Sequence, residues 1–323
     1  MKPIRFHSHS LALLVVLGIQ CPGTVGSGPQ AHDRPALETR TTSDVAEAYL
    51  ALCFGVERDD DWAVEMGQLF ATDALFIDPT TAFFGMSLAD GIEGRENITS
   101  AMHSFNLNGH ALDIQASFTS GDHYVVFGEF SYMTQRAAQP DGPLIKVAFP
   151  FTTILRVEAG LIHERRDYGD YWELSRSIAR HEAGPDGVGS GLEPLDALEK
   201  HLRDLADPYL AAYFERDEET LAGWWARDFC WTEPTASLFQ SSAPVCGAEA
   251  VLELFGAAEA ADERISTPVG SFTTDKFAVF LQRADLASTE SAATESKPTQ
   301  SLIVIEFEGD KVLRHLEFNG DAL

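Results

Sequence analysis

The hydrophobic positions in the first part of the chain recur at helical spacing. Five apolar residues share the positions i, i+4, i+7, i+8 and i+11: Val45, Tyr49, Leu52, Cys53 and Val56. This spacing marks one face of a helix. Shorter apolar patterns over residues 62–70 and 98–105 each predict a further helix. The first part of the chain is therefore predicted to be helical.

The apolar stretches that follow have the composition of strands. YVVFGEFSYM (124–133) and IKVAFPFTTILRVEAG (145–160) are rich in β-branched and aromatic residues, and the turn-forming QPDGP lies between them. Runs of helices followed by runs of strands indicate an α+β fold with an antiparallel sheet, because parallel sheets need helices and strands to alternate.

One pattern of eleven residues occurs twice, as LFIDPTTAFFG from Leu75 and as CWTEPTASLFQ from Cys230. Aligned over fifteen positions, from Ala71 and from Ala226, the two segments share five identical residues. The match extends upstream, where YLALCFGVERDDDW (49–62) faces YLAAYFERDEET (209–220). A match that extends outward is typical of an internal repeat.

The last predicted strand is also repeated. Anchoring Ile162 on Val312 places Asp167 opposite Glu317, and it places Tyr168 opposite a phenylalanine. The sequence therefore predicts that one domain has been duplicated.

A chain of 323 residues exceeds the usual size of one hydrophobic core, so two domains are expected. We predict a first domain over 40–180, a Gly-rich linker over 181–192 and a divergent second copy over 193–323. The start of the second copy allows two interpretations. Asp207 and Pro208 begin its first helix, or Pro208 kinks a longer helix that begins near Glu193.

The net charge of the chain argues against polyanionic partners. Lys and Arg total 23 against 50 Asp and Glu, which gives a formal net charge of -27. A surface this acidic repels phosphates of nucleic acids and anionic lipid headgroups, so no nucleic-acid partner is expected. No later segment approaches the roughly 20 apolar residues that a membrane-spanning helix needs, so no transmembrane segment is expected either.

The first 26 residues have the layout of a signal peptide. Lys2 and Arg5 precede the apolar run LALLVVLGI, and Cys21 and a Gly/Ser-rich stretch follow it. We therefore expect a secreted or periplasmic protein. A lipid anchor through Cys21 is the alternative.

The remaining cysteines fit an oxidising compartment. Cys230 and Cys246 lie close enough in sequence to form a disulfide, and Cys53 falls on the apolar helical face as a buried thiol. The sequence has no CxxC motif or His-rich cluster, so no metal is expected. It has no phosphate loop or dinucleotide fingerprint, so no cofactor is expected.

Several motifs together resemble the nuclear-transport-factor-two-like fold of the SnoaL-like group. They are Tyr49 on the first helix, FIDPT at 76–80, GIEGRENI at 91–98 and GLIHERRDYGDYW at 160–172. The group contains polyketide cyclases, ketosteroid isomerases and limonene-epoxide hydrolases. The resemblance implies an α+β architecture of two tandem cone-shaped domains, each with three helices packed on a strongly curved, mainly antiparallel sheet. It does not fix a reaction, because one fold hosts many functions.

The resemblance also implies catalytic roles for three residues. The base of a ketosteroid isomerase is an Asp directly before a Pro, matched here by Asp78. The first oxyanion donor is a Tyr on the first helix, matched by Tyr49. A carboxylate can abstract a proton beside a carbonyl while a phenol stabilises the enolate. Asp167 matches a catalytic Asp of limonene-epoxide hydrolases and would be the acid or position water.

The internal comparison gives a second reason to single out acids. A carboxylate occurs in both copies at two positions, which pair Asp78 with Glu233 and Asp167 with Glu317. Acids that face one apolar cavity acquire raised or split pKa values, as proton transfer requires. We expect the ligand-binding residues to be Phe76, Tyr168, Trp172, Glu129, Glu233, Glu317 and Tyr209.

Each of these residues also has a plainer interpretation. Asp78 before Pro79 shapes a turn at a strand end. Asp167 pairs with Arg165 or Arg166 on a solvated strand face, and Tyr49 is a core residue. The aromatic residues 168, 171 and 172 line a pocket mouth, or they cover the interface between the two units.

The expected function is binding of a small hydrophobic molecule by the first domain, with acid-base isomerisation, cyclisation or hydration of that molecule. The alternative is a non-catalytic ligand carrier or protein-interaction module that uses the duplicated sheet surface. In that case the tandem copies form an intramolecular pseudo-dimer, or the chain forms a homodimer.

Overall fold

The computed structural model describes residues 40–55, 61–84, 87–104, 108–135, 142–183, 193–233, 244–257, 264–286 and 299–321. The predicted signal peptide and Cys21 lie outside these residues. None of the helices within the described ranges is long and apolar enough to cross a membrane.

The first domain begins with the helices that the apolar spacing predicts: α1 (Thr42–Phe54), α2 (Trp62–Gly67) and α3 (Arg95–Ser104). The start of α1 is fixed by a capping box, in which Thr41 and Asp44 each accept a hydrogen bond from the backbone N–H of the other. The apolar face of α1 is buried as Val45, Ala46, Tyr49, Leu50 and Cys53.

A six-stranded sheet follows these helices, in the order β2-β1-β6-β5-β4-β3. Its strands are β1 (Phe70–Ile77), β2 (Ile92–Glu93), β3 (Asn108–Ser120), β4 (His123–Thr134), β5 (Ile145–Glu158) and β6 (Leu161–Gly169). β1 pairs with β6 in parallel, and the other neighbours are antiparallel. Two short 3-10 segments, η3 (Pro79–Phe84) and η4 (Ser87–Ala89), connect β1 to β2. A further helix, α4 (Tyr171–Ala183), follows β6.

The second domain repeats this arrangement. Its helices are α5 (Glu193–Glu215), α6 (Glu218–Trp224) and α7 (Ala248–Ala257). Its strands are β7 (Trp225–Thr232), β8 (Val245–Cys246), β9 (Arg264–Thr274), β10 (Phe277–Leu286), β11 (Thr299–Glu308) and β12 (Lys311–Asp321). The strand order β8-β7-β12-β11-β10-β9 is the same as in the first sheet. The chain thus has an α+β fold of two tandem units, each with an open, mainly antiparallel sheet.

The register of the parallel pair agrees with the predicted alignment of the copies. In the first sheet Phe76 pairs with Arg165, and in the second sheet Trp231 pairs with His315. These are the positions that the alignment equates. Equivalent residues of the two copies therefore occupy equivalent positions in their sheets.

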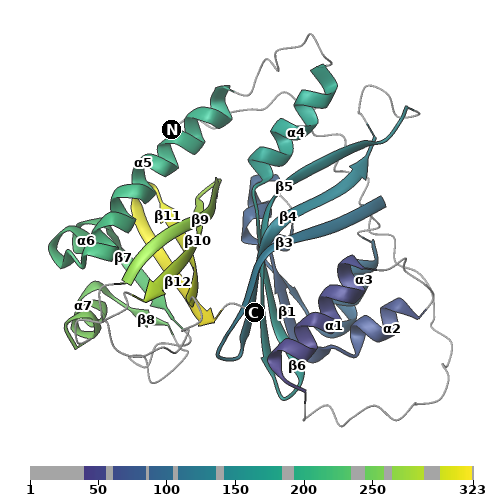
Figure 1. The fold of residues 1–323 in the computed structure, drawn as a ribbon, viewed down its shortest axis with the longest axis horizontal. Helices are drawn as coiled ribbons and strands as arrows, with labels where there is room; N and C mark the ends of the chain where they lie inside the picture. Colours follow the sequence, from purple (N-terminus) through teal and green to yellow (C-terminus); the bar gives the residue numbers. More distant parts are fainter. Residues whose placement is uncertain are drawn as a thin grey trace.

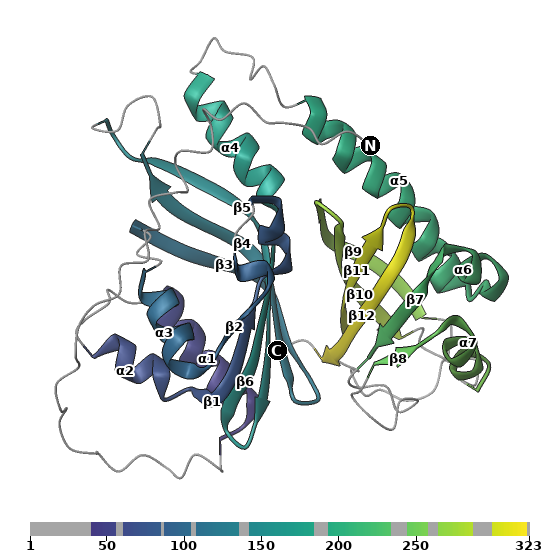
Figure 2. The same ribbon diagram turned by 180° about the vertical axis from the view of Figure 1, so that it is seen from behind.

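The two faces of each sheet have different neighbours. On β4, Tyr124 and Val126 lie in the cluster with α1, α2 and α3, whereas Val125 and Phe127 lie in a cluster shared with the second sheet. The second sheet follows the same alternation, because successive side chains of a strand point to opposite faces. In Figure 1 and Figure 2 the helices α1 to α3 accordingly cover one sheet on the side away from the other sheet, and α6 and α7 lie beyond the second sheet.

Close contacts connect the two units. The rings of Tyr168 and Phe277 have their centroids 5.7 Å apart, and the backbone N–H of Asn319 donates to Oγ of Ser120 at 3.1 Å. A Cβ at Gly320 would lie only 2.1 Å from the carbonyl oxygen of Thr119. The end of β12 can approach β3 this closely because position 320 has no side chain.

Helix boundaries decide one alternative of the sequence interpretation and add one helix to it. The second domain starts with the longer of the two predicted helices, since Pro208 lies inside α5 and does not begin a helix. Helix α4 was not predicted as a helix, and it extends to Ala183, so the first residues of the predicted linker are helical. Linker residues 184–192 lie outside the described ranges.

Candidate functional site

Asp78 directly follows β1 and is only 3% exposed. Its Oδ1 accepts hydrogen bonds from the backbone N–H of Thr80 at 3.1 Å and from the Thr80 hydroxyl at 2.5 Å. Its Oδ2 accepts a hydrogen bond from the hydroxyl of Tyr171 at 2.6 Å. The Thr80 hydroxyl accepts in turn from the backbone N–H of Gly169 at 3.0 Å. Asp78 thus shapes a local turn, as its plainer interpretation expects, and it is also held in the interior by a distant helix.

The pKa of Asp78 is raised from 3.8 to about 7. Burial is the main cause, because it disfavours the charged carboxylate, and the negative charge of Asp167 adds to the effect. The hydrogen bonds from Thr80 and Tyr171 oppose the rise. Asp78 is therefore poised to gain and lose a proton near neutral pH.

Asp167 lies on β6 and is 2% exposed. Arg165 donates from Nε to Oδ1 at 3.0 Å and from a terminal nitrogen to Oδ2 at 2.5 Å, and the Thr153 hydroxyl donates to Oδ1 at 2.5 Å. Burial raises the pKa of Asp167, and the Arg165 guanidinium opposes that rise. The predicted pairing with Arg165 is thus present, but in the interior and not on a solvated face.

Tyr49 and Phe76 lie against this ion pair. The guanidinium carbon of Arg165 is 4.3 Å from the ring centroid of Phe76 and 5.3 Å from that of Tyr49. Tyr49 is fully buried, and its hydroxyl donates to Sγ of Cys53 at 3.5 Å. Burial raises the pKa of Tyr49 well above its ordinary value, so its phenol stays protonated. In this geometry the donor to Asp78 is Tyr171 and not Tyr49.

Three residues predicted to bind ligand lie elsewhere. Tyr168 is buried between the two sheets, because its neighbour Asp167 points to the opposite face. Trp172 lies in the core cluster of the second domain, with residues of α5. Glu129 is exposed on β4. The structure therefore corrects the expectation for Tyr168 and Trp172 towards the alternative that they cover the interface, and it separates Glu129 from the buried acids.

The second domain has its own buried polar group at the equivalent positions. Glu317, which corresponds to Asp167, accepts hydrogen bonds from the hydroxyls of Tyr213 and of Ser301, the latter at 3.1 Å. His315 occupies the position of Arg165, is fully buried, and has Nε2 3.8 Å from Oε2 of Glu317. Its Nδ1 shares a hydrogen bond of 2.9 Å with the hydroxyl of Tyr209.

The chemistry of this second group differs from the first. Burial would raise the pKa of Glu317, but the neighbouring His315 and the hydrogen bond from the Tyr213 hydroxyl lower it below its ordinary value. Glu233, which corresponds to Asp78, is half-buried and accepts a hydrogen bond from the side-chain amide of Asn319 at 2.9 Å. The acid Glu317 therefore has a lowered pKa, whereas its counterpart Asp167 in the first domain has a raised one.

Sequence reasoning missed Tyr171 as a partner of Asp78, as well as Thr80, Thr153 and His315. The signal for His315 was available, because the alignment that equates Asp167 with Glu317 also equates Arg165 with His315. The alternation of side chains along β6 could also have separated Tyr168 from Asp167. Nothing in the sequence pattern connects Tyr171 to Asp78, which lies 93 residues earlier.

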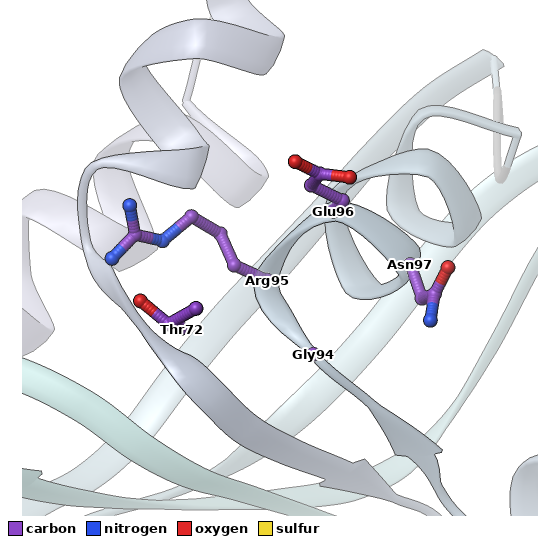
Figure 3. A pocket seen from close by; sticks show the side chains of 5 residues that line it. All are labelled: Thr72, Gly94, Arg95, Glu96 and Asn97. Carbon is purple, nitrogen blue, oxygen red and sulfur yellow. The ribbon is translucent and has the colours of Figure 1, made fainter.

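A separate surface pocket lies at the start of α3 (Figure 3). Its volume is about 360 Å³, and it is lined by Thr72, Gly94, Arg95, Glu96 and Asn97. Two polar side chains are held here by backbone carbonyl oxygens. Nε of Arg95 donates to the carbonyl of Phe70 at 2.7 Å, and the side-chain amide of Asn97 donates to the carbonyl of Glu93 at 2.9 Å. Throughout the described residues, no group of three or more His, Cys, Asp or Glu side chains could hold a metal ion.

No protein-family model matches the chain, and the search of curated proteins returns no match. Solved structures do match. A protein of the SnoaL-like polyketide cyclase type from Shewanella denitrificans is 18% identical, over 42% of this chain and 96% of its own, with a TM-score of 0.35. A ketosteroid-isomerase-like protein from Catenulispora acidiphila is 20% identical, over 43% and 94%, with a TM-score of 0.34.

An epoxide hydrolase from M. tuberculosis, of the limonene-epoxide hydrolase-like type, is 16% identical over 42% of this chain and 88% of its own, with a TM-score of 0.32. Each similarity covers a part of the chain about the size of one domain. The Shewanella structure is described as SnoaL-like and the Catenulispora structure as having a ketosteroid-isomerase-like fold. Identities this low say nothing about the reaction.

Proposed function

We propose that the first domain binds a small hydrophobic molecule and transfers protons on it by acid-base catalysis. The observation that carries this proposal is the state of Asp78, a buried carboxyl with a pKa of about 7 that is hydrogen-bonded to the phenol of Tyr171. A base works best when its pKa lies near the working pH, because it is then both available and strong enough. Isomerisation, cyclisation and hydration all need such a step.

The surrounding residues support distinct roles. Asp78 is the base that accepts a proton from carbon, and Tyr171 is the neutral donor, since burial and the charge of Asp78 raise the pKa of Tyr171 well above its ordinary value. Asp167 and Arg165 form a fixed ion pair whose negative end raises the pKa of Asp78. Tyr49 and Phe76 supply aromatic surface around this pair.

We further propose that the protein is exported to an oxidising compartment, secreted or periplasmic. The basic and apolar layout of the first 26 residues supports export. The disulfide between Cys230 and Cys246, which ties β7 to β8, supports an oxidising environment.

A second candidate function is favoured by the contact between the sheets. In this candidate the tandem copies form an intramolecular pseudo-dimer. The burial of each sheet's outer face against the other sheet supports it. Such an arrangement explains the duplication without any chemistry. In this candidate the first domain carries a ligand and releases it unchanged.

Native mass spectrometry of the purified protein, incubated in deuterated water, separates the two candidates. The catalytic candidate predicts a retained small molecule that gains deuterium on the wild-type protein and not on Asp78→Asn. The rate of gain should rise with pH through about 7, because only ionised Asp78 accepts a proton. The variant Asp73→Asn is the matched control, since Asp73 is exposed on β1, the strand that Asp78 directly follows. A retained molecule that gains no deuterium on any form supports the carrier.

A further inference from the structure

Two adjacent residues of α4 contact different domains. Tyr171 donates its hydroxyl to Asp78 of the first domain, whereas Trp172, 1% exposed, lies in the core cluster of the second domain with Leu195 and Leu202 of α5. Helix α4 itself packs on β5 of the first sheet through Leu174. One turn of one helix therefore connects the candidate base to the interior of the other domain.

Ion pairs attach the same helix to α5. Arg176, whose side chain is 13% exposed, donates from Nε to Asp196 at 3.0 Å and from a terminal nitrogen to Glu199. Its guanidinium also lies 3.6 Å from Glu173 of α4, so the cation is flanked by acids of both helices. A shielded cation of this kind holds the helices in one relative position better than an exposed pair does. In both ribbon views α4 stands beside β5, and α5 runs alongside the second sheet (Figure 1 and Figure 2).

The ring of Tyr171 lies directly against the backbone that holds Asp78. A Cβ at Gly169 would lie 3.0 Å from Cζ of Tyr171 and 3.1 Å from the ring of Phe149. The N–H of Gly169 donates to Thr80, which donates to Asp78, so the ring packs directly on the backbone that holds the acid. A small displacement of α4 therefore changes the hydrogen bond to Asp78.

The second copy supplies its equivalent acid in another way. The donor to Glu233 is Asn319, which belongs to β12 of the same sheet. In the first copy the donor to Asp78 comes from a helix that is attached to the neighbouring domain. Both donors thus touch the other domain, since the backbone N–H of Asn319 donates to Oγ of Ser120. The donor to Asp78 differs in coming from a helix that packs on the neighbouring domain and not from a strand of the same sheet.

We propose that the second domain positions Tyr171 on Asp78 through α4, with Trp172 and Arg176 as the positioning residues. The catalytic consequence rests on the proposed function, but the positioning itself does not. The second domain then has a role in the first site without binding the same molecule, and the duplication provides the support that a single domain would lack.

The test is the pKa of Asp78 in the full-length protein without ligand. It is measured from the carboxyl ¹³C chemical shift, assigned by comparison with Asp78→Asn. Tyr171→Phe removes the donor and should raise the pKa of Asp78 by about one, the effect of a hydrogen bond to a charged group. Trp172→Leu and Arg176→Met should raise it in the same direction and by no more than Tyr171→Phe.

Matched variants make the outcome specific. Arg180→Met lies on the same helix, and Arg180 pairs with Glu173 of α4 itself, so this variant should leave the pKa of Asp78 unchanged. Trp172→Phe should restore much of the wild-type value. If Trp172→Leu does not fold, Arg176→Met alone decides. A raised pKa in Tyr171→Phe with wild-type values in Trp172→Leu and Arg176→Met overturns the inference, as does an unchanged pKa in Tyr171→Phe.

The readout also separates this inference from the proposed function. No molecule need bind for the pKa of Asp78 to be measured. Absence of deuterium gain on a retained ligand would remove the catalytic candidate and leave the positioning intact. Unchanged pKa values in the variants, together with normal deuterium gain, would remove the positioning and leave the catalytic candidate intact.

Discussion

Asp78→Asn should stabilise the first domain at alkaline pH, although it removes the candidate base. The folded pKa of about 7 lies above the ordinary value of 3.8, so between these two values the folded state holds a proton that the unfolded chain has released. The stability that neutral Asp78 contributes is therefore fully present below about pH 4 and is lost as the pH rises through about 7.

The size of the effect follows from the same two values. At 1.36 kcal/mol for each pKa unit, ionising Asp78 costs the folded domain on the order of 4 kcal/mol. Asparagine has nearly the same shape and stays neutral at every pH. The variant should thus match the wild type near pH 4 and exceed it by up to about 4 kcal/mol near pH 8.

The assay is urea denaturation followed by far-ultraviolet circular dichroism, at several pH values between about 4.5 and 8.5. The wild type should lose stability across this range relative to Asp78→Asn, and the exposed variant Asp73→Asn should follow the wild type. If Asp78→Asn is less stable than the wild type near pH 8, or keeps the same pH dependence, Asp78 is not a buried acid with a raised pKa and the proposed function fails with it.

Three further changes test other parts of the structure. Arg165→Met should destabilise the first domain by about 3–5 kcal/mol in urea denaturation, because it leaves the buried charge of Asp167 without its partner. Replacing both cysteines of the Cys230–Cys246 disulfide, which closes a loop with a sequence separation of 16, should cost the second domain about 3 kcal/mol in the same assay. Gly320→Ala should lower the melting temperature and increase binding of a hydrophobic dye, because its Cβ would collide with a backbone oxygen of β3 and separate the sheets.

Each of these has a control. Adding Asp167→Leu to Arg165→Met should recover stability, since the unpaired charge is then gone; persistent loss would show that packing and not charge is responsible. Reducing agent should reproduce the effect of the double cysteine variant. Gly223→Ala, where a Cβ would meet nothing within 4 Å, should leave dye binding unchanged. Equal dye binding by Gly320→Ala and the wild type would contradict the close sheet contact.

Local pattern predicted most of the fold. The spacing of Val45, Tyr49 and Cys53 predicted α1 because an amphipathic helix carries its period in the sequence. The repeat of FIDPT as WTEPT predicted the second sheet in the correct register, because duplicated segments keep their pairing. The length of α5 could not be decided from sequence, since Pro208 is compatible with either a helix start or a helix interior.

The candidate site was predictable only in part. Asp78 and Asp167 stood out because acids recur at both positions of the repeat. The arrangement of their partners depends on which strands and helices meet. Tyr171 reaches Asp78 only because α4 folds back beside β5, and Trp172 leaves the site only because a second domain covers it. Contacts between distant segments produce no periodic pattern in the sequence, so they could not be predicted from it.

The alternation of side chains along β6 limits the substitutions that this strand can accept during evolution. Arg165 and Asp167 serve the interior of the first domain, and the intervening Arg166 and the following Tyr168 face outward, where Tyr168 meets the second domain. An ordinary surface strand has one face on which substitutions are nearly neutral. From 165 to 168 almost no position of this strand has that freedom. A single inserted residue would turn the ion pair towards the second domain and the tyrosine towards the interior of the first. Substitutions that survive here should therefore come as matched changes on both domains, whereas the loops can diverge independently.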